Sequence, residues 1–268
     1  MRSLGVSVPK VKEQQTNEDS IRFDSTLIAV SDGAGGGGVY ADRWARYLLE
    51  NLPKEPITTA DELDQWLDGI WEPFYNSCEE DAKKDGGLLL SKFYKEGSFA
   101  TLVAVWIDSG NKCRWMSYGD SVAFHFNSKN GILEHSFTKL SDFDNPPHLI
   151  NCKDPINDSA FRSGVFEIDK GSVIFVASDA LSHYILMMYE VANQSKYAEE
   201  LSAALNSHSK NVAPIKLALS QKVFFETKVL NKLCNVCQSE KQFSDYIAAK
   251  LKKGLLLNDD MSFAFVKF

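Results

Sequence analysis

Short runs of apolar residues alternate with polar and acidic positions along much of this chain. Runs of this length are typical of buried strands. They predict strands at residues 21–30, 113–118, 122–126, 173–178 and 261–266. Apolar residues at helical spacing predict helices over residues 40–52 and 59–84, the second capped by Thr58 or Thr59, and mostly helical structure over residues 181–253.

Acidic residues stand at the ends of these predicted strands. Asp32 follows the apolar residues 27–30 and precedes a glycine-rich stretch, and Asp179 repeats this context after its own apolar run. The pairs Glu18–Asp19 and Asp259–Asp260 directly precede predicted strands. Asp120 lies in Gly119-Asp120-Ser121, between two apolar runs, as in a hairpin turn. Taken singly, each cluster is explained as an ordinary polar turn.

The recurrence of these clusters favours a shared site at one edge of a sheet sandwich. Carboxylates that converge repel one another unless cations neutralise them. Oxygen ligands without paired histidine or cysteine suit Mg²⁺ or Mn²⁺ better than zinc or copper. The sequence therefore predicts a divalent-cation site.

Six segments, in order along residues 5–268, resemble the motifs of the PP2C-type metal-dependent serine/threonine phosphatases, in a divergent, bacterial-type form. The resemblance implies an α+β fold, a four-layer α/β/β/α sandwich with two antiparallel sheets face to face and helices outside. The segments are Asn17-Glu18-Asp19, Ser31-Asp32-Gly33-Ala34-Gly35-Gly36, Gly97-Ser98-Phe99-Ala100-Thr101, Gly119-Asp120-Ser121, Ser178-Asp179-Ala180-Leu181 and Asp259-Asp260-Met261-Ser262.

The resemblance also implies the roles of individual residues at a centre of two Mn²⁺ or Mg²⁺ ions. Asp32 would bridge the ions, the Gly33 carbonyl would bind one, and Asp179 and Asp259 would bind the other. Asp32, Asp179 and Asp259 are thus the catalytic candidates, since water bridging the ions would attack the phosphate. The remaining metal candidates are Glu18 through a bound water, Asp19 beside it, Asp120 with Asp179 at a third, weaker ion, and Asp260 if the last motif is shifted by one.

Three departures from the family pattern concern how substrate phosphate is held and which residue would act as a general acid. Gln14 occupies the position of an arginine that grips phosphate in many members, and Lys12 or Lys10 is the candidate substitute. Ala34 replaces a histidine found in some members. Ala180 and Val122 replace a glycine and an arginine of two turns. We predict an active phosphatase acting on phosphoserine and phosphothreonine in proteins. The alternatives are a pseudophosphatase used as a binding or regulatory module, and a hydrolase of a small phosphorylated metabolite.

Length and charge narrow the class of protein further. The 268 residues are consistent with one domain, residues 1–268, and the net charge of −7 argues against general binding to nucleic acid or anionic membranes. Since residues 1–4 lack an apolar signal core, we expect a cytoplasmic protein, and we expect a monomer. The odd count of five cysteines predicts free thiols, and Cys234 and Cys237 are interpreted as structural rather than zinc-binding.

Two further features are ambiguous in the sequence. Residues 128–164 are rich in turn formers, and in the family an equivalent region lies near the site and bears on substrate choice, although a plain surface loop explains the composition. His183 follows Asp179 closely, but a lone histidine there is interpreted as a bystander.

Overall fold

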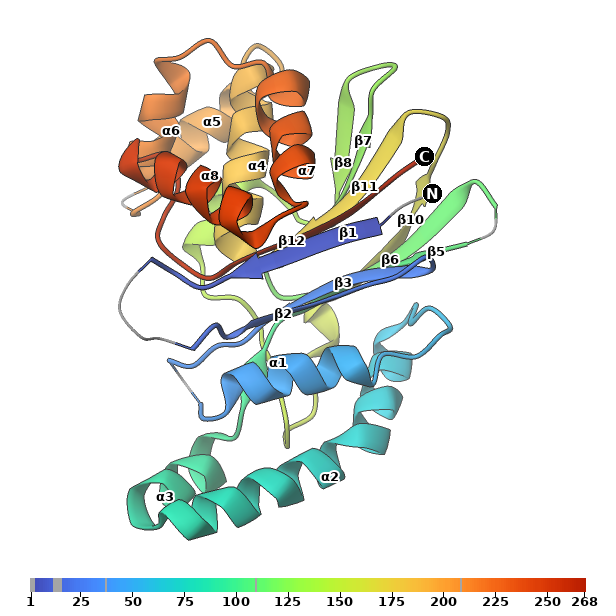
Figure 1. The fold of residues 1–268 in the computed structure, drawn as a ribbon, viewed down its shortest axis with the longest axis vertical. Helices are drawn as coiled ribbons and strands as arrows, with labels where there is room; N and C mark the ends of the chain where they lie inside the picture. Colours follow the sequence, from blue (N-terminus) through green and yellow to red (C-terminus); the bar gives the residue numbers. More distant parts are fainter. Residues whose placement is uncertain (1–2, 12–15, 37, 109, 208) are drawn as a thin grey trace.

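Two antiparallel sheets pack face to face, and helices cover the outer face of each sheet (Figure 1). The computed structural model describes residues 3–11, 16–36, 38–108, 110–207 and 209–268. This arrangement confirms the predicted α+β, four-layer sandwich. No helix within these ranges has the length and apolar content needed to cross a membrane.

The first sheet has five strands in the order β1-β12-β11-β7-β8, with every neighbouring pair antiparallel. It therefore joins the first and last strands of the chain side by side. Its strands are β1 (Ser3–Val8), β7 (Val122–Asn127), β8 (Ile132–His135), β11 (Ser172–Ala177) and β12 (Met261–Lys267).

The second sheet also has five strands, in the order β10-β6-β5-β3-β2. Its strands are β2 (Asp19–Phe23), β3 (Leu27–Asp32), β5 (Leu102–Ile107), β6 (Lys112–Tyr118) and β10 (Phe161–Glu167). A small two-stranded sheet pairs β4 (Phe99–Ala100) with β9 (Ile150–Asn151).

Two groups of helices cover the sandwich. The first group is α1 (Ala41–Glu50), α2 (Ala60–Asp85) and α3 (Gly87–Glu96). The second is α4 (Asp179–Ala192), α5 (Ala198–Leu205), α6 (Val212–Leu219), α7 (Asn231–Val236) and α8 (Glu240–Lys252), with a π-helical turn η3 (Phe225–Leu230) before α7. The 3₁₀ turns η1 (Leu140–Asp144) and η2 (Asp158–Ala160) lie in the long connection between β8 and β10.

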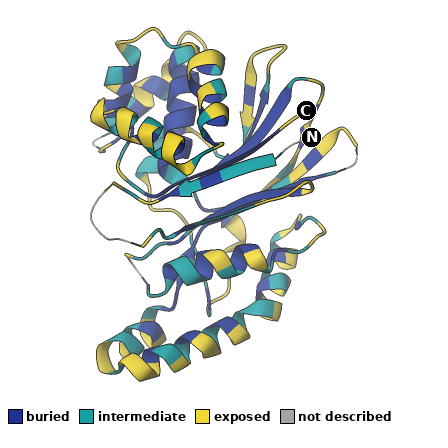
Figure 2. Cartoon of the chain, in the orientation of Figure 1, coloured by how far each residue is buried: buried dark blue, intermediate teal, exposed yellow. Residues whose placement is uncertain are grey.

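Three hydrophobic layers hold the four structural layers together (Figure 2). Between the sheets, Ile28 and Val30 of one sheet belong to the same buried cluster as Ile174 and Val176 of the other. Strands buried on both faces carry consecutive apolar residues, which explains the uninterrupted runs in the sequence. The outer layers pack α1–α3 on the second sheet and α4–α8 on the first.

The helix predictions are confirmed for α1, for α2 and for the predominantly helical stretch after Asp179. Thr59 caps α2: its hydroxyl accepts the Glu62 amide, and the Glu62 carboxylate accepts the Thr59 amide in return. Helix α3 was not predicted. Its leucines are consecutive rather than spaced along one helical face, and Leu88 is 91% exposed.

The strand register brings the acidic ends of the strands to one edge of the sandwich. Asp19, the first residue of β2, pairs with Asp32, the last residue of β3. In the other sheet Ala177, the last residue of β11, pairs with Val122 on one side and with Phe263 on the other. Three acidic segments therefore lie at the same edge of this sheet. They are the turn that holds Asp120, the start of α4 and the residues directly before β12.

Candidate metal centre

Asp19 and Asp32 form the centre of the acidic edge. Asp19 is only 6% exposed, and neither of its carboxylate oxygens has a hydrogen-bond partner among the described residues. Burial raises the pKa of Asp19 to about 7, and the nearby hydroxyls of Ser262 and Ser178 lower it less. Burial raises the pKa of Asp32 well above its usual value, and the charge of Asp19 raises it further. The pair is poised to attract positive charge.

Asp179 reaches the same edge from the other sheet. It is the first residue of α4, directly after β11, and its carboxylate accepts the neighbouring amide of Ala180. Burial, and then the charge of Asp259, raise the pKa of Asp179 to about 6. The charge of Asp179 in turn raises the pKa of Asp32, so the two carboxylates act on each other across the two sheets.

Asp120 lies in the turn between β6 and β7, and that turn is tied to the strand end at Asp32. Gly119 adopts φ +99°, which favours glycine, and a Cβ there would lie 2.7 Å from the Thr101 side chain. The Thr101 hydroxyl accepts the Asp32 amide at 3.2 Å and lies 2.7 Å from the Ser121 hydroxyl. Burial, and then the charge of Asp179, raise the pKa of Asp120 to about 7.

Glu18 lies over the glycine-rich loop. A Cβ built on Gly35 would lie 2.0 Å from Glu18 Oε1, so the absence of a side chain at position 35 makes room for this carboxylate. Burial raises the pKa of Glu18, and the charge of Lys10 opposes the rise. Gly33 is equally confined, because its Cβ would lie 2.7 Å from the carbonyl oxygens of Glu18 and Ala41. The loop glycines thus permit close backbone approach at the site.

Asp259 and Asp260 have different surroundings. The Asp260 carboxylate accepts the backbone amides of Lys10 and Glu18, each at 2.8 Å, and so ties the segment after β1 to the start of β12. The charge of Asp259 raises the pKa values of Asp32, Asp120 and Asp179, whereas the charge of Asp260 raises those of Glu18 and Asp19. Both residues therefore act on the acidic cluster, but the Asp260 carboxylate already accepts two backbone amides, whereas Asp259 lines a cavity with Asp179.

The chemistry of these residues fits a hard divalent cation. Their donors are oxygens, and the two buried Asp19 oxygens accept no hydrogen bond from any residue that the structure describes. Within the described ranges, however, no three His, Cys, Asp or Glu side chains lie close enough together to hold one ion. Charges act over longer distances than the roughly 2.0–2.6 Å of metal–oxygen bonds. The carboxylates thus face one another without forming a closed cage, and the ligand assignments remain predictions.

Two cations that the sequence reasoning missed lie at this edge. Arg162 of β10 lowers the pKa of Asp120, and its guanidinium donates to the Gly119 carbonyl at 2.8 Å. Lys210 lowers the pKa of Asp179. Neither residue is near an acidic motif in the sequence, and only the pairing of β10 with β6 and the position of the loop before α6 bring them there.

The predicted phosphate contact, Lys12, and the departure at Gln14 lie outside the described residues. His183 lines a small cavity of about 40 Å³ together with Asp179, Lys210 and Asp259. Its burial lowers its pKa to about 4. A neutral His183 therefore borders the acidic edge at neutral pH.

A larger cavity, of about 320 Å³, opens beside Asp120. Arg162 and Asp142 line it together with the proline-containing loop at residues 145–148. Part of the turn-rich stretch 128–164 therefore borders the acidic edge rather than forming a remote surface loop.

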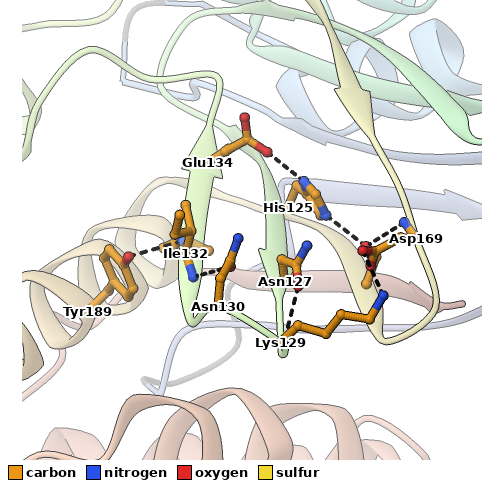
Figure 3. Close-up of polar contacts among 10 residues, drawn as sticks. His125, Asn127, Lys129, Asn130, Ile132, Glu134, Asp169 and Tyr189 are labelled. Carbon is orange, nitrogen blue, oxygen red and sulfur yellow. Dashed lines mark hydrogen bonds and ion pairs between the residues drawn. The ribbon is translucent and has the colours of Figure 1, made fainter.

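A second polar cluster, shown in Figure 3, superficially resembles a hydrolytic triad. His125 lies 2.7 Å from a Glu134 carboxylate oxygen and 2.9 Å from the Ser172 hydroxyl. Ser172 is completely buried, and its hydroxyl also accepts the Asp169 amide at 3.1 Å. A buried serine whose hydroxyl is already used in hydrogen bonds has a structural role. Together with His125 and Glu134, it joins β7, β8 and β11.

The fold is similar to those of solved bacterial phosphatases. The catalytic domain of the serine/threonine protein phosphatase PstP, in complex with two manganese ions, matches with a TM-score of 0.55 and 14% identity over 98% of this chain and 96% of its own. PppA, a regulatory component of the type VI secretion system (T6SS) in Pseudomonas aeruginosa, matches with a TM-score of 0.55 and 16% identity over 100% and 97% of the two chains. The serine/threonine phosphatase of S. agalactiae matches with a TM-score of 0.53 and 17% identity over 99% and 98%.

The relationship to these phosphatases is detected by comparison of structures and not by comparison of sequences. No family model and no curated protein sequence matches this chain. The similarity in structure nevertheless extends over nearly the whole of both chains in all three cases. The chain therefore has the fold of the PP2C-type bacterial serine/threonine phosphatases.

Proposed function

We propose that this protein is a Mg²⁺- or Mn²⁺-dependent phosphatase that hydrolyses phosphoserine and phosphothreonine in proteins. The proposal rests on the acidic residues that gather at one edge of a phosphatase fold, namely Asp19, Asp32, Asp120, Asp179 and Asp259. Burial and the charges of neighbouring carboxylates raise the pKa values of the first four. A buried acidic edge without cations is costly, so the arrangement is explained by a cationic cofactor.

The proposed roles follow from the contacts of each residue. Asp32 is the central ligand, since it faces Asp19 across β2 and β3 and the charges of Asp19 and Asp179 both raise its pKa. Asp259 is the preferred ligand of the last motif, because backbone amides already occupy Asp260. When bound, divalent cations would activate water for attack on phosphorus and neutralise charge on the phosphate.

The cavity beside Asp120 is the proposed entry for the phosphorylated segment. Arg162 is half-buried on its wall and presents a planar guanidinium to an anion, which Lys12 and Lys10 would not do. Because both substrates carry the phosphate that the guanidinium would hold, replacement of Arg162 by Gln should raise KM for a phosphopeptide and for p-nitrophenyl phosphate roughly tenfold or more. Arg114→Gln, on the neighbouring strand β6, is the matched control.

Turnover of a phosphothreonine peptide with Mn²⁺ tests the proposal directly. The wild-type protein and the Glu72→Gln control, an exposed change on α2, should show metal-dependent turnover, and Asp32→Asn should lose at least a hundredfold. Equal turnover by Asp32→Asn would contradict the assignment.

Calorimetric titration with Mn²⁺ separates the alternatives. Absence of binding at millimolar metal by a folded protein would indicate a pseudophosphatase. Metal-dependent turnover confined to small phosphate esters would indicate a metabolite hydrolase, so a substrate panel belongs with the titration.

A further inference from the structure

A groove of about 570 Å³ lies in the helical layer over the first sheet, between the segment at residues 221–236 and α8. Its volume is in the range of ligand-binding pockets. Met188 contributes to it from α4, nine residues after Asp179. At 1.5 Å per helical residue, this is about 13 Å along the helix from the acidic edge. The groove is therefore separate from the proposed metal centre.

Five lysines line this groove, although the protein as a whole is acidic, with a net charge of −7. They come from two segments that are adjacent in space. Three belong to the segment at residues 221–236, and two belong to the end of α8 and the residue that follows it. They are Lys222, Lys228, Lys232, Lys250 and Lys253. No carboxylate is among the lining residues. Glu226 and Asp245 belong to the same elements without lining the groove.

These lysines form no ion pair with the described acidic residues. Among the described residues, none of the five lies within 4.0 Å of a carboxylate, whereas six other lysines form such ion pairs. Lys250 is held over the rings of Tyr184 and Tyr246, at 5.7 Å and 5.0 Å from their centroids. Lys222 lies 5.0 Å from the Phe224 ring centroid. Unpaired like charges gathered at one concave surface repel one another, and an anion would relieve that repulsion.

The remaining lining residues are mainly apolar. Val229 and Leu255 are buried, and Phe224 is 50% exposed on the groove side of η3. Aliphatic walls between two sets of lysines suit a chain that carries several carboxylates and one apolar side chain. A compact phosphate would instead be held by converging donors, most often an arginine fork, and no arginine is among the described residues that line this groove. A flat anionic membrane does not enter a concave surface.

We propose that this groove binds an acidic peptide segment of a partner protein, with carboxylates on the lysines and one apolar side chain against Val229 and Leu255. The interaction is independent of metal and of phosphatase activity. It would give a partner or a substrate protein a contact separate from the acidic edge.

Fluorescence polarisation with the full chain tests this proposal. The probe is a labelled twelve-residue peptide rich in Asp and Glu with one central Leu, with EDTA present. We expect saturable binding that weakens at least tenfold between about 0.05 and 0.5 M salt. The same peptide with Asn and Gln in place of the acids should not bind. Absence of saturable binding by the acidic peptide would overturn the proposal.

Two double variants with equal charge change locate the site. Lys228→Glu with Lys232→Glu alters exposed groove lysines, and Lys241→Glu with Lys252→Glu alters exposed lysines of α8 that do not line the groove. The first should weaken binding at least tenfold and the second less than twofold. Equal loss in both would show a nonspecific charge effect and overturn the proposal.

Binding and competition experiments with other anions distinguish the acidic peptide from other possible ligands of the groove. ATP, inorganic phosphate and vesicles containing phosphatidylserine are the probes. Binding of any of these with the same dependence on Lys228 and Lys232, together with failure of the acidic peptide to bind, would overturn the peptide assignment. Since metal is absent, none of these outcomes depends on whether the protein is a phosphatase.

Discussion

Asp19 and Asp32 lie directly opposite each other on the adjacent antiparallel strands β2 and β3. Like charges in this position destabilise a sheet. Burial increases the cost, because the Asp19 oxygens have no hydrogen-bond partner in the described part of the chain. Such an arrangement persists where a bound cation offsets it, which connects the register of one hairpin to the proposed chemistry.

Removal of this repulsion should affect stability in opposite ways with and without metal. Asp19→Asn should stabilise the metal-free protein by roughly 1–3 kcal/mol, because it removes a buried charge beside Asp32. It should also reduce the rise in Tm that Mn²⁺ produces. Thermal melts with Mn²⁺ and with EDTA check both effects, and Glu72→Gln should change neither. A lower Tm of Asp19→Asn in EDTA would contradict this explanation.

The raised pKa values predict how pH acts on metal binding. Asp19 and Asp120 have pKa values of about 7 and Asp179 of about 6, against an ordinary value of 3.8. The folded, metal-free protein thus binds protons more tightly than the unfolded chain. The contribution of these three groups to stability is greatest below their unfolded pKa and is lost as the pH rises through the folded values.

Protons and cations compete for the same oxygens, so Mn²⁺ affinity should increase as the pH rises from about 5.5 to about 8. Calorimetry in buffers of different ionisation enthalpy should detect proton release near pH 6.5. Metal affinity that does not change over this range would show that these carboxylates do not bind the cation.

Two neighbouring glycines provide a matched test of the loop. Gly35→Ala places a Cβ 2.0 Å from Glu18 Oε1 and should displace this carboxylate, whereas a Cβ at Gly36 meets no atom within 4 Å. We expect Gly35→Ala to lower metal-dependent turnover about tenfold or more, and Gly36→Ala to change it less than twofold. Equal turnover of the two variants would show that the position of Glu18 is unimportant.

Glu190 of α4 provides a test of stability away from the acidic edge. It is 2% exposed, its Oε2 has no hydrogen-bond partner in the described ranges, and burial raises its pKa to about 8. The folded state therefore holds a proton that the unfolded chain releases near pH 4.5, so stability is lost between about pH 4.5 and 8.

Glu190→Gln should remove this loss and stabilise the protein by roughly 1–3 kcal/mol at pH 8, with little effect at pH 4.5. Urea unfolding at the two pH values is the measurement. Glu199→Gln, on the partly exposed first turn of α5, is the control. A similar stability change at both pH values would indicate a packing effect instead.

Much of the fold could be predicted from the repeated acidic motifs, because each motif marks the end of a strand. The apolar runs of β3 and β11 are continuous since both faces of these strands are buried, and this is visible in sequence. Helix α2 was equally readable from its apolar stripe and its Thr59 cap. Helix α3 was not, because contacts with α2 rather than its own pattern stabilise it.

The amino-acid sequence by itself determined which residues stand at strand ends and that their donors are oxygens. Only the tertiary structure decided which of them face one another, because register and sheet packing join residues that are far apart in the chain. It separated Asp259 from Asp260 by the amides that the latter holds, and it brought Arg162 beside Asp120. The lysine groove arose in the same way, since its charges belong to segments whose packing no local pattern encodes.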